Sequence, residues 1–200
     1  MELKRVVVTG MGALTPVGNT LEEYWSGLLN GVSGADMITL FDASKFKTRF
    51  ACEVKNFDAT NFMDRKEARK IDRFTQFALV VSDEAMLDAG LNKENINPDR
   101  IGVVFGSGIG GLITFQNEVI EFAKGDGTPR FNPFFIPKMI LDIAAGQISM
   151  RHNLRGPNFA VTSACASSTN AIMEAVNLIR LGKSDIIISG GSEAVISEAG

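Results

Sequence analysis

Residues 156–168 of this chain read GPNFAVTSACASS, and this stretch decides the fold class. Phe159 to Thr162 is a short apolar run that predicts a strand, and Ala166 to Leu181 predicts a helix that Gly182 ends. The nearly all-apolar run from Asp185 to Ser189 predicts another strand. Strands that alternate with helices indicate an α/β layer fold in which much of the sheet is parallel or mixed.

The earlier part of the chain continues this alternation. Thr20 and Glu23 form a capping-box pattern that predicts the start of a helix, and Gly31 supplies its left-handed end. Asp64 is predicted to cap a long helix that runs to about Ala89. The other predicted elements are strands at Lys4 to Thr9, Phe50 to Val54 and Ile101 to Phe105, a helix from Leu112 to Lys124, and a helix with Pro137 near its start.

The bulk composition is that of an ordinary soluble globular protein with one domain. The 200 residues are 45% hydrophobic and 22% charged, with a formal net charge of −3, which argues against general nucleic-acid binding. The two longest charge-free stretches, Ile101 to Asn117 and Gly156 to Met173, are rich in small and polar residues, so neither predicts a membrane span. No secretory signal is recognisable at the N-terminus. Cys52 and Cys165 do not suggest a disulfide framework, which favours a reducing cytoplasm.

Cys165 lies where the predicted strand gives way to the predicted helix. A sharp turn at such a point exposes its apex residue and directs the first N–H groups of the helix towards it. The partial positive charge at a helix N-terminus favours a thiolate, and the same N–H groups can bind the oxyanion formed when a thioester is attacked. Residues 166–173 carry no charge and many small side chains, so we expect this helix to be buried nearly all round.

The alternative is that Cys165 is a small core residue, as most free cysteines are. Position alone does not decide between these two interpretations. Cys52 lies in an ordinary strand pattern, and we expect its side chain to pack in the core. The single histidine, His152, lies near a predicted helix end, where a surface role is expected.

The whole chain resembles the N-terminal part of the β-ketoacyl-[acyl carrier protein] synthase family, especially its elongating type II enzymes of bacterial fatty acid synthesis. Residues 156–168 resemble the active-site segment of that family, and this match is highly specific. With the resemblance, a nucleophilic Cys165 becomes the favoured interpretation. The other matching stretches occur in order along the chain: RVVVTGMG (5–12), TPVG (15–18), RKEARK (65–70), GSGIGG (106–111), PFFIP (133–137) and GGSEA (190–194).

The resemblance implies a thiolase-like fold of two related halves in αβαβα layers, usually in a homodimer. Residues 1–200 would then be the N-terminal half, with a mixed sheet and a buried helix that starts at the nucleophile, and the C-terminal half is absent. The family relies on two histidines, a lysine and a backbone oxyanion donor from its second half. His152 matches neither histidine, so we expect the 200 residues alone to be unable to condense substrates.

The resemblance also implies a two-stage reaction. Cys165 would take an acyl chain from acyl carrier protein as a thioester. Malonyl carrier protein would then lose carbon dioxide, and the resulting carbanion would attack that thioester. Covalent catalysis of this kind divides one difficult condensation into easier steps. No cofactor, metal ion, nucleic acid or membrane is implied.

The family uses the segment at 65–70 to dock its carrier protein, which is strongly acidic. The resemblance therefore implies a docking role for Lys66, Arg69 and Lys70, with Arg130 as a weaker candidate. Complementary charge mainly speeds encounter and sets orientation. Without the resemblance, such a charge run is usually a solvated helix face.

The resemblance assigns Ile109 and Phe135 to substrate binding. The position of Ile109 lines the acyl tunnel in related enzymes, and that of Phe135 reaches the tunnel of the partner subunit. Without the resemblance, both residues would be assigned to core packing. Side chains of this size can set which acyl chains fit, because an apolar slot discriminates by about 1–3 kcal/mol per methylene.

Other functions remain open at this point. Residues 106–111 satisfy the G-x-G-x-x-G pattern of dinucleotide sites, but the acidic residue expected about 20 positions later is replaced by a loop. The glycines are better explained by close passage of the backbone near the acyl pocket. A polyketide-type ketosynthase, a thiolase and a non-catalytic dimerisation fragment are the remaining alternatives.

Overall fold

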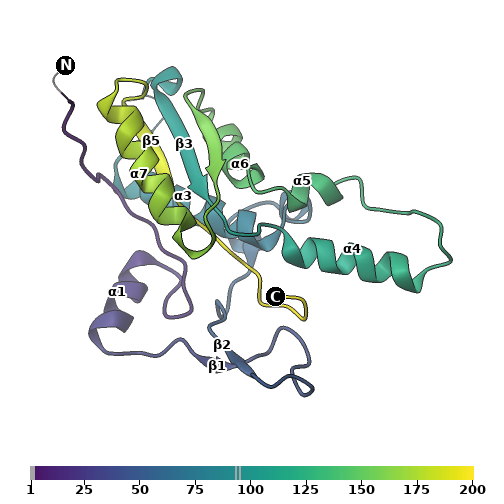
Figure 1. The fold of residues 1–200 in the computed structure, drawn as a ribbon. Coiled ribbons are helices and arrows are strands. Elements are labelled where there is room, and N and C mark those ends of the chain that lie inside the picture. Colours follow the sequence, from purple (N-terminus) through teal and green to yellow (C-terminus); the bar gives the residue numbers. More distant parts are fainter. Residues whose placement is uncertain (1–2, 93, 95) are drawn as a thin grey trace.

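A parallel three-stranded sheet forms the centre of the computed structural model, which describes residues 3–92, 94 and 96–200 (Figure 1). Its middle strand is β3 (Ile101–Gly106), with β4 (Asn158–Val161) on one side and β5 (Ile186–Gly191) on the other. All six residues of β3 are buried. Burial of both faces explains why this strand is a continuous apolar run rather than an alternating one.

Helices cover both faces of the sheet (Figure 1). α7 (Ser167–Arg180) connects β4 to β5 and packs on one face, against β3 and β5. α6 (Ile143–His152) packs on the other face, and α3 (Arg73–Asp88) packs against α6. The core of this side includes Phe74 and Ile148, which are fully buried. The order helix, sheet, helix confirms the predicted α/β layer fold.

The capping box at Thr20 is confirmed. α1 spans Leu21–Leu29, and the Thr20 side chain accepts a hydrogen bond from the Glu23 N–H at 3.2 Å. Glu23 Oε2 in turn accepts from the Asn19 N–H at 2.7 Å, one residue before the cap. Gly31 follows the helix with a φ of +63°, the left-handed conformation that a residue without a Cβ adopts most easily.

The strand predicted at Lys4 to Thr9 is wrong, because these residues form no regular secondary structure and Val8 is 78% exposed. The chain just beyond them runs along α3. There Asp88 Oδ2 accepts a hydrogen bond from the Met11 N–H at 2.9 Å. Glu84, also in α3, accepts one from the Ala13 N–H at 2.7 Å. The segment that follows the predicted strand is therefore held by side chains of α3 and not by strand pairing.

The strand predicted at Phe50 to Val54 is shorter in the structure. β2 (Phe50–Ala51) pairs antiparallel with β1 (Asp36–Met37), so the chain contains both parallel and antiparallel pairing. Directly after β2 the Glu53 side chain turns inward and accepts a hydrogen bond from the Thr39 N–H at 2.9 Å. This carboxylate ties the segment after β2 back to the chain that follows β1.

The long helix predicted from Asp64 to Ala89 is divided in two. α2 (Arg65–Ala68) forms a single turn, and α3 starts afresh behind its own N-cap, Asp72, whose carboxylate accepts from the Phe74 N–H at 3.2 Å. Asp72 is buried and also accepts from the Thr114 N–H at 3.2 Å. A buried carboxylate requires such partners, and the free N–H groups in the first turns of α3 and α4 supply them.

Two helices between β3 and β4 project from the body (Figure 1). α4 (Leu112–Lys124) has the predicted boundaries, yet none of its residues is buried, and α5 (Phe135–Met139) lies against it. Phe131 stacks on Phe122 at 5.3 Å and on Phe135 at 5.5 Å between ring centroids. We call residues 112–139 the arm.

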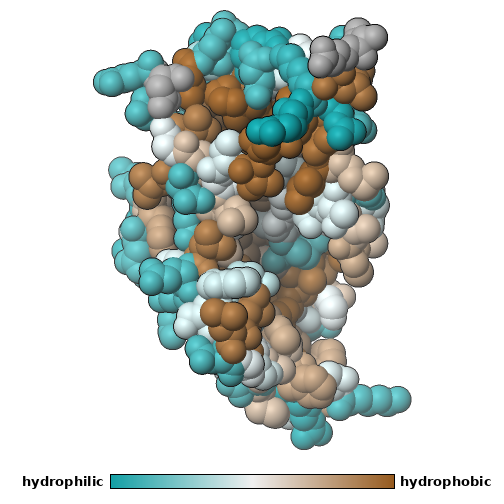
Figure 2. Space-filling model, turned by 90° about the vertical axis from the view of Figure 1, so that its left-hand side faces the viewer, coloured by the Kyte–Doolittle hydropathy of each residue, from teal (hydrophilic) through white to brown (hydrophobic). Residues whose placement is uncertain are grey.

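The remaining elements are the short 3-10 helices η1 (Ala59–Asn61), η2 (Pro98–Arg100) and η3 (Ala164–Ala166). Within the part of the chain that the structure describes, no helix is both long and apolar enough to traverse a bilayer. Figure 2 shows apolar and polar surface side by side on one face of the molecule. Large apolar side chains are exposed in several elements, including Trp25 of α1 and Met173 of α7.

Candidate active site

Cys165 lies on a tight turn between β4 and α7, as the sequence predicts. The turn is η3, and the Cys165 side chain is exposed. Ala164, directly before the cysteine, has a φ of +52°, a left-handed conformation that costs a residue with a Cβ about 1–2 kcal/mol. Strain of this kind persists only where surrounding contacts impose it, and it is concentrated at functional sites.

Side chains of the turn itself impose the strain. The buried Ser167 hydroxyl accepts a hydrogen bond from the Ser163 N–H at 2.9 Å and donates to the Ala164 carbonyl at 2.7 Å. Asn170, one turn into α7, donates from Nδ2 to the Ser163 hydroxyl at 2.6 Å. These bonds join the residues on both sides of Cys165 and brace the backbone of the turn that carries it.

The prediction that α7 is buried nearly all round is wrong for this chain. Ser167, Ala171 and Ala175 are buried, whereas Ile172 and Met173 are 49% and 59% exposed. Only the face with small residues contacts the sheet, where it permits close approach. The first turn of α7 contains no acidic residue, so no side chain there offsets the positive end of the helix dipole.

The glycine-rich segment after β3 lies beside the turn. A Cβ on Gly106 would lie 2.5 Å from the Ser167 carbonyl carbon, so β3 reaches the start of α7 only with glycine there. Two residues later, the Gly108 carbonyl accepts a hydrogen bond from the Thr162 hydroxyl at 3.4 Å. A Cβ on Gly108 would lie 3.7 Å from the Ala164 carbonyl oxygen. Close passage of the backbone is therefore the structural reason for Gly106, whereas a Cβ on Gly108 would first meet the Glu193 side chain, at 2.8 Å.

Glu193, which follows β5, binds the same glycine-rich segment and was missed by sequence reasoning. Its carboxylate accepts hydrogen bonds from the N–H groups of Gly108, Ile109 and Gly110 and from the Ser107 hydroxyl. A signal was present, because parallel strands end at one edge of a sheet and β3 and β5 were both predicted. A carboxylate directly after β5 was therefore positioned to meet the loop after β3.

These bonds also bear on the dinucleotide alternative. A phosphate bound at a G-x-G-x-x-G segment requires the free N–H groups of the loop. Here three consecutive N–H groups, at residues 108–110, already donate to a carboxylate of the same chain. The segment is therefore an internally occupied anion site and not an open phosphate cradle.

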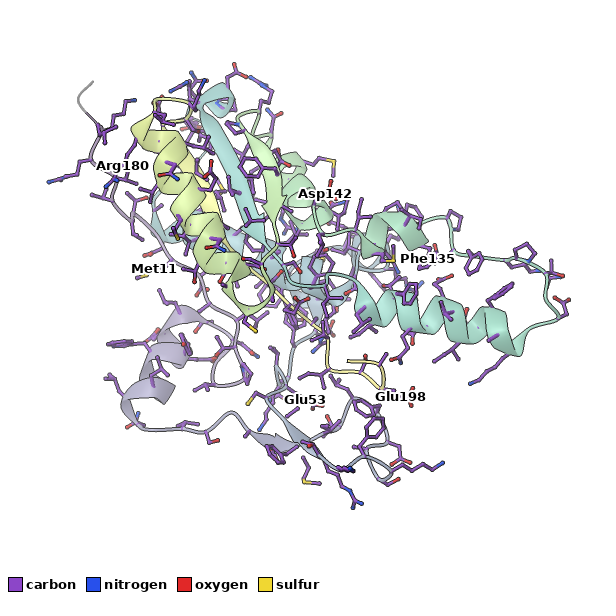
Figure 3. All side chains as sticks on the ribbon, in the orientation of Figure 1. Met11, Glu53, Phe135, Asp142, Arg180 and Glu198 are labelled. Carbon is purple, nitrogen blue, oxygen red and sulfur yellow. The ribbon has the colours of Figure 1, made fainter. Side chains whose placement is uncertain are left out.

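Ile109 and Phe135 belong to neighbouring backbone segments. The end of α5 touches the glycine-rich loop, where the Gly111 N–H donates to the Met139 carbonyl at 3.1 Å. Ile109 is 53% exposed. Phe135 is half-buried and stacks on Phe115 of α4, with 6.2 Å between ring centroids, and Figure 3 labels it on α5. Within the described part of the chain, no ring contact or hydrogen bond joins these two side chains.

The basic residues 66, 69 and 70 are all exposed, although the helix predicted to carry them is a single turn. Lys66 lies within α2, and Arg69 is its C-cap residue. Lys70 Nζ lies 5.6 Å from the centre of the Phe134 ring, which places this basic segment next to the base of α5. We call residues 65–70 the basic turn, and the structure places it beside the arm.

Two other arginines, Arg73 and Arg130, make contacts of their own away from the exposed basic residues. Arg73 is directed inward and lies 5.0 Å from the centre of the Phe77 ring, and burial lowers the pKa of its guanidinium below the ordinary value. Arg130 is exposed on the loop of the arm, where it pairs with Asp126 at 3.7 Å. Among the residues that the structure describes, no ion pair or hydrogen bond links Arg130 to the basic turn.

The core assignment of Cys52 is wrong, because its side chain is exposed. Side chains alternate along this stretch, and it is the neighbouring Glu53 that turns inward. Cys52 borders a cavity of about 210 Å³ whose lining also includes Phe77 and Glu193. This cysteine is therefore the natural internal comparison for the reactivity of Cys165.

His152 lies at the C-terminal end of α6, as expected, but it is partly buried rather than on open surface. Its Nε2 lies 2.9 Å from Asp83 Oδ1, and Arg151 pairs with the same carboxylate at 2.8 Å. The hydrogen bonds described above for the Cys165 turn do not involve this histidine. His152 is therefore a packing residue between α6 and α3.

The sequence profile described as "Beta-ketoacyl synthase, N-terminal domain" matches residues 3–200 of the chain. The chain belongs to this family. A relative from Synechocystis, 3-oxoacyl-[acyl-carrier-protein] synthase 2, is 48% identical over 198 residues, which are 98% of this chain and 47% of the relative. The protein of the same name from Staphylococcus aureus strain N315 is 47% identical over 194 residues, 97% of this chain and 47% of the relative.

A solved structure of a β-ketoacyl synthase relative has the same fold. The ishigamide ketosynthase/chain length factor is 28% identical to this chain and superposes with a TM-score of 0.91, covering 98% of this chain and 49% of that one. The thiolase-like fold expected from the sequence is thereby confirmed for the family domain. The chain spans about half the length of the curated relatives it matches.

Proposed function

We propose that the protein containing this chain is a 3-oxoacyl-[acyl-carrier-protein] synthase of fatty acid elongation, with Cys165 as the acyl-accepting nucleophile. The observation that carries the proposal is the strained and braced turn that presents an exposed Cys165 at the start of α7, in a chain of the β-ketoacyl synthase family. The names of the relatives at 47–48% identity favour this activity over that of a thiolase or a polyketide-type ketosynthase.

The proposed reaction has two bond-forming steps. The Cys165 thiolate attacks the carbonyl carbon of an acyl thioester, a new carbon–sulfur bond forms, and the carrier-protein thiolate leaves and takes up a proton. Malonyl carrier protein then loses carbon dioxide, and the electron pair left on its α-carbon attacks the acyl group on Cys165. The carbon–sulfur bond to Cys165 breaks, which regenerates the thiolate and releases the 3-oxoacyl thioester.

The chain supplies two parts of this chemistry. The N-terminus of the 14-residue α7 favours negative charge on the thiolate and on the oxyanion of each tetrahedral intermediate. The bonds of Ser167 keep the turn in one conformation, so the sulfur does not have to be reoriented before attack. The remaining proton transfers are proposed to use groups outside these 200 residues.

Intact-protein mass spectrometry with peptide mapping tests the nucleophile. The complete protein is incubated with acyl carrier protein carrying a saturated acyl thioester, without malonyl donor. We expect one acyl adduct on Cys165, its loss in Cys165→Ser, and its retention in Cys52→Ser, the matched control at the other exposed cysteine. An adduct on Cys52 alone, or no adduct on either cysteine, overturns the proposal.

We also propose that residues 1–200 alone are inactive in condensation, since they correspond to 47% of the relatives' length. Purified residues 1–200 and the complete protein are compared with acyl and malonyl carrier protein as substrates. Formation of 3-oxoacyl product is expected with the complete protein only. Turnover by the 200-residue chain contradicts this part of the proposal.

The exposed basic turn is proposed to dock an acidic carrier protein through Lys66, Arg69 and Lys70, with Arg130 as a further contact. Reversing Lys66 and Lys70 to Glu in the complete protein should raise KM for acyl carrier protein about tenfold and leave kcat largely unchanged, because rim charges act mainly on encounter. The matched control reverses Lys45 and Lys47, which are also exposed and lie on the loop between β1 and β2. An unchanged KM for acyl carrier protein in the variant with Lys66 and Lys70 reversed overturns the docking assignment.

Ile109 is proposed to line the acyl slot, because it lies on the loop that passes the Cys165 turn and its side chain is 53% exposed. Ile109→Phe should shorten the longest acyl chain that acylates Cys165. A discrimination of about 10–200-fold per added methylene is the scale expected for an apolar slot. The measurement is the rate of Cys165 acylation across a series of acyl lengths, and an unaltered profile excludes the assignment.

A homodimer is proposed for the complete protein, with Phe135 contributing to the acyl tunnel of the partner subunit. The exposed apolar side of the arm, which includes Phe115, Val119 and Phe122, supports a covered rather than a solvated surface. Light scattering on the complete protein should give twice the mass of one chain. A stable monomer with full activity contradicts this proposal.

A further inference from the structure

The Glu193 carboxylate makes four hydrogen bonds with the loop after β3, and both of its oxygens take part. Oε2 accepts from the N–H groups of Gly108 at 2.6 Å and Ile109 at 3.0 Å. Oε1 accepts from the Gly110 N–H at 3.1 Å and from the Ser107 hydroxyl at 3.3 Å. Three consecutive N–H groups around one anion fix the path of the backbone through residues 108–110.

Glu193 is itself held firmly from both sides. The neighbouring Ser192 donates from its N–H to the Gly106 carbonyl at 3.1 Å and from its hydroxyl to the Phe74 carbonyl at 2.8 Å. The following Ala194 is buried in the core. The carboxylate is thus anchored to the sheet and to α3, while the loop that it binds has no regular secondary structure.

The bound loop lies between Glu193 and the Cys165 turn. The Gly108 N–H faces the carboxylate, and the Gly108 carbonyl accepts from the Thr162 hydroxyl at the base of the turn. Ile109 is therefore held through its own N–H and through both neighbours, while its side chain remains 53% exposed. The Glu193 carboxylate is thus bonded directly to the backbone of Ile109 and of both its neighbours.

We propose that Glu193 is a positioning residue that sets the depth of the acyl slot by fixing the backbone of Ile109. This inference rests on the proposed function, because it takes Ile109 to line that slot. Glu193 acts through the loop and is not proposed to contact the substrate. A residue that merely ties two strand ends together would affect folding but would not change which acyl chains are accepted.

The test compares acylation rates of Cys165 for short and long saturated acyl carrier protein thioesters in the complete protein. In Glu193→Gln, an amide NH₂ group replaces one acceptor oxygen and faces the loop donors. We expect the ratio of long-chain to short-chain rates to change about tenfold, the lower end of what an apolar slot discriminates. Glu193→Asp keeps the charge and should restore most of the native ratio.

Glu198→Gln is the matched control, because it makes the same charge change five residues later. Glu198, labelled in Figure 3, accepts one long hydrogen bond of 3.4 Å from the Gln116 side chain. Its ratio of long-chain to short-chain rates should equal that of the native protein. Melting temperatures of all variants separate a loss of folded protein, which lowers both rates in proportion, from a change in the ratio.

Gly108→Ala provides an approach from the loop side in case Glu193→Gln does not fold. Its Cβ would lie 2.8 Å from Glu193 Oε2, the mobile end of a side chain, so the carboxylate and not the backbone must shift. The ratio should change in the same direction as in Glu193→Gln. An unchanged ratio in every folded variant overturns the inference, and the proposed function itself fails only if native Cys165 is not acylated.

Discussion

The body around β3 and the arm formed by α4 and α5 contrast in how their apolar residues are used. In the body, Phe74 and Val104 are completely buried, and the strand ends are joined by backbone and side-chain hydrogen bonds. In the arm, α4 has equally regular apolar spacing but no buried residue. Its rings stack mainly on the rings of the same arm.

The contrast teaches that apolar periodicity predicts a helix but not its burial. The residues of α4 select a helical conformation, and what covers its apolar face depends on neighbouring elements. The body has such neighbours within the 200 residues, whereas α4 packs mainly against the short α5 of the same arm. The predictions below measure this difference in the complete protein, starting with the largest expected effect.

Removing one ring from each region should give very different losses of stability. Phe74→Ala should lower the free energy of unfolding by about 3–5 kcal/mol, because the ring is fully buried. Phe122→Ala, in the arm, should cost about 0.5–1.5 kcal/mol in residues 1–200, the scale of one aromatic contact, because the ring is 42% exposed there. A larger loss is expected in the complete protein, where the proposed partner subunit covers the arm. Urea unfolding of both variants provides the measurement, and an equally small Phe122 loss in the complete protein would contradict the proposed cover.

Adding one methyl group should separate tight from open backbone positions. Gly106→Ala should cost about 1–3 kcal/mol, since the new Cβ would meet main-chain atoms of Ser167 at 2.5 Å. Gly146→Ala in α6 is the control, because no atom lies within 4 Å of its added Cβ. It should stabilise the protein by about 0.5–1 kcal/mol through helix propensity. The comparison fails if the two substitutions have the same sign in thermal melts.

Removing a methyl group should have opposite signs at the active-site turn and in the arm. Ala164→Gly relieves a φ of +52° and should raise the free energy of unfolding by about 0.5 kcal/mol, after the entropy of glycine in the unfolded chain is subtracted. Ala123→Gly near the end of α4 should lower it by up to about 1 kcal/mol. Destabilisation by Ala164→Gly would show that the turn is not strained.

The smallest effect concerns an exposed ion pair between the starts of β3 and β5. Hydrogen bonds from Arg100, and then from Lys4, hold the pKa of Asp185 well below its ordinary value. Because the folded-state pKa is the lower one, the stabilisation is present above about pH 4 and is lost as the pH falls towards the folded value. Asp185→Asn should therefore slightly lower the urea midpoint at neutral pH and leave it unchanged at strongly acidic pH.

The matched control for this substitution is Asp126→Asn in the arm. The pKa of Asp126 is also lowered, mainly by the Thr128 N–H, but that contact lies within one loop. Its removal should move the unfolding midpoint in the same pH range, but by less than the removal of Asp185. A larger effect for Asp126 than for Asp185 would reverse the ranking of the two regions.

Most of the body could be predicted from the sequence. β3, β5 and α7 are continuous patterns with clear ends, and the turn at Cys165 follows from their order. Where the elements differ from the prediction, carboxylates bind backbone far away in the sequence: Asp72 accepts from the Thr114 N–H, and Glu53 accepts from the Thr39 N–H. Local patterns do not reveal these partners.

The candidate site was predicted only in part. Cys165 and the glycine-rich loop were found because their residue types carry a local signal, whereas Glu193 has none beyond its place after an apolar strand. Its role appears once β3 and β5 are known to lie side by side. The exposure of Ile172 and Met173 on α7 was not foreseen, because absence of charge does not determine which neighbours a helix has.

The order of the strands has a consequence for biosynthesis. β3 is the middle strand, yet both of its neighbours come later in the chain, and β5 ends only at residue 191. During translation, this apolar strand therefore leaves the ribosome some 85 residues before its last neighbour exists, and the edge that pairs with β5 stays open in the meantime. A nascent chain stalled before β5 should be a strong substrate for chaperones that bind apolar segments, and one stalled beyond it should not.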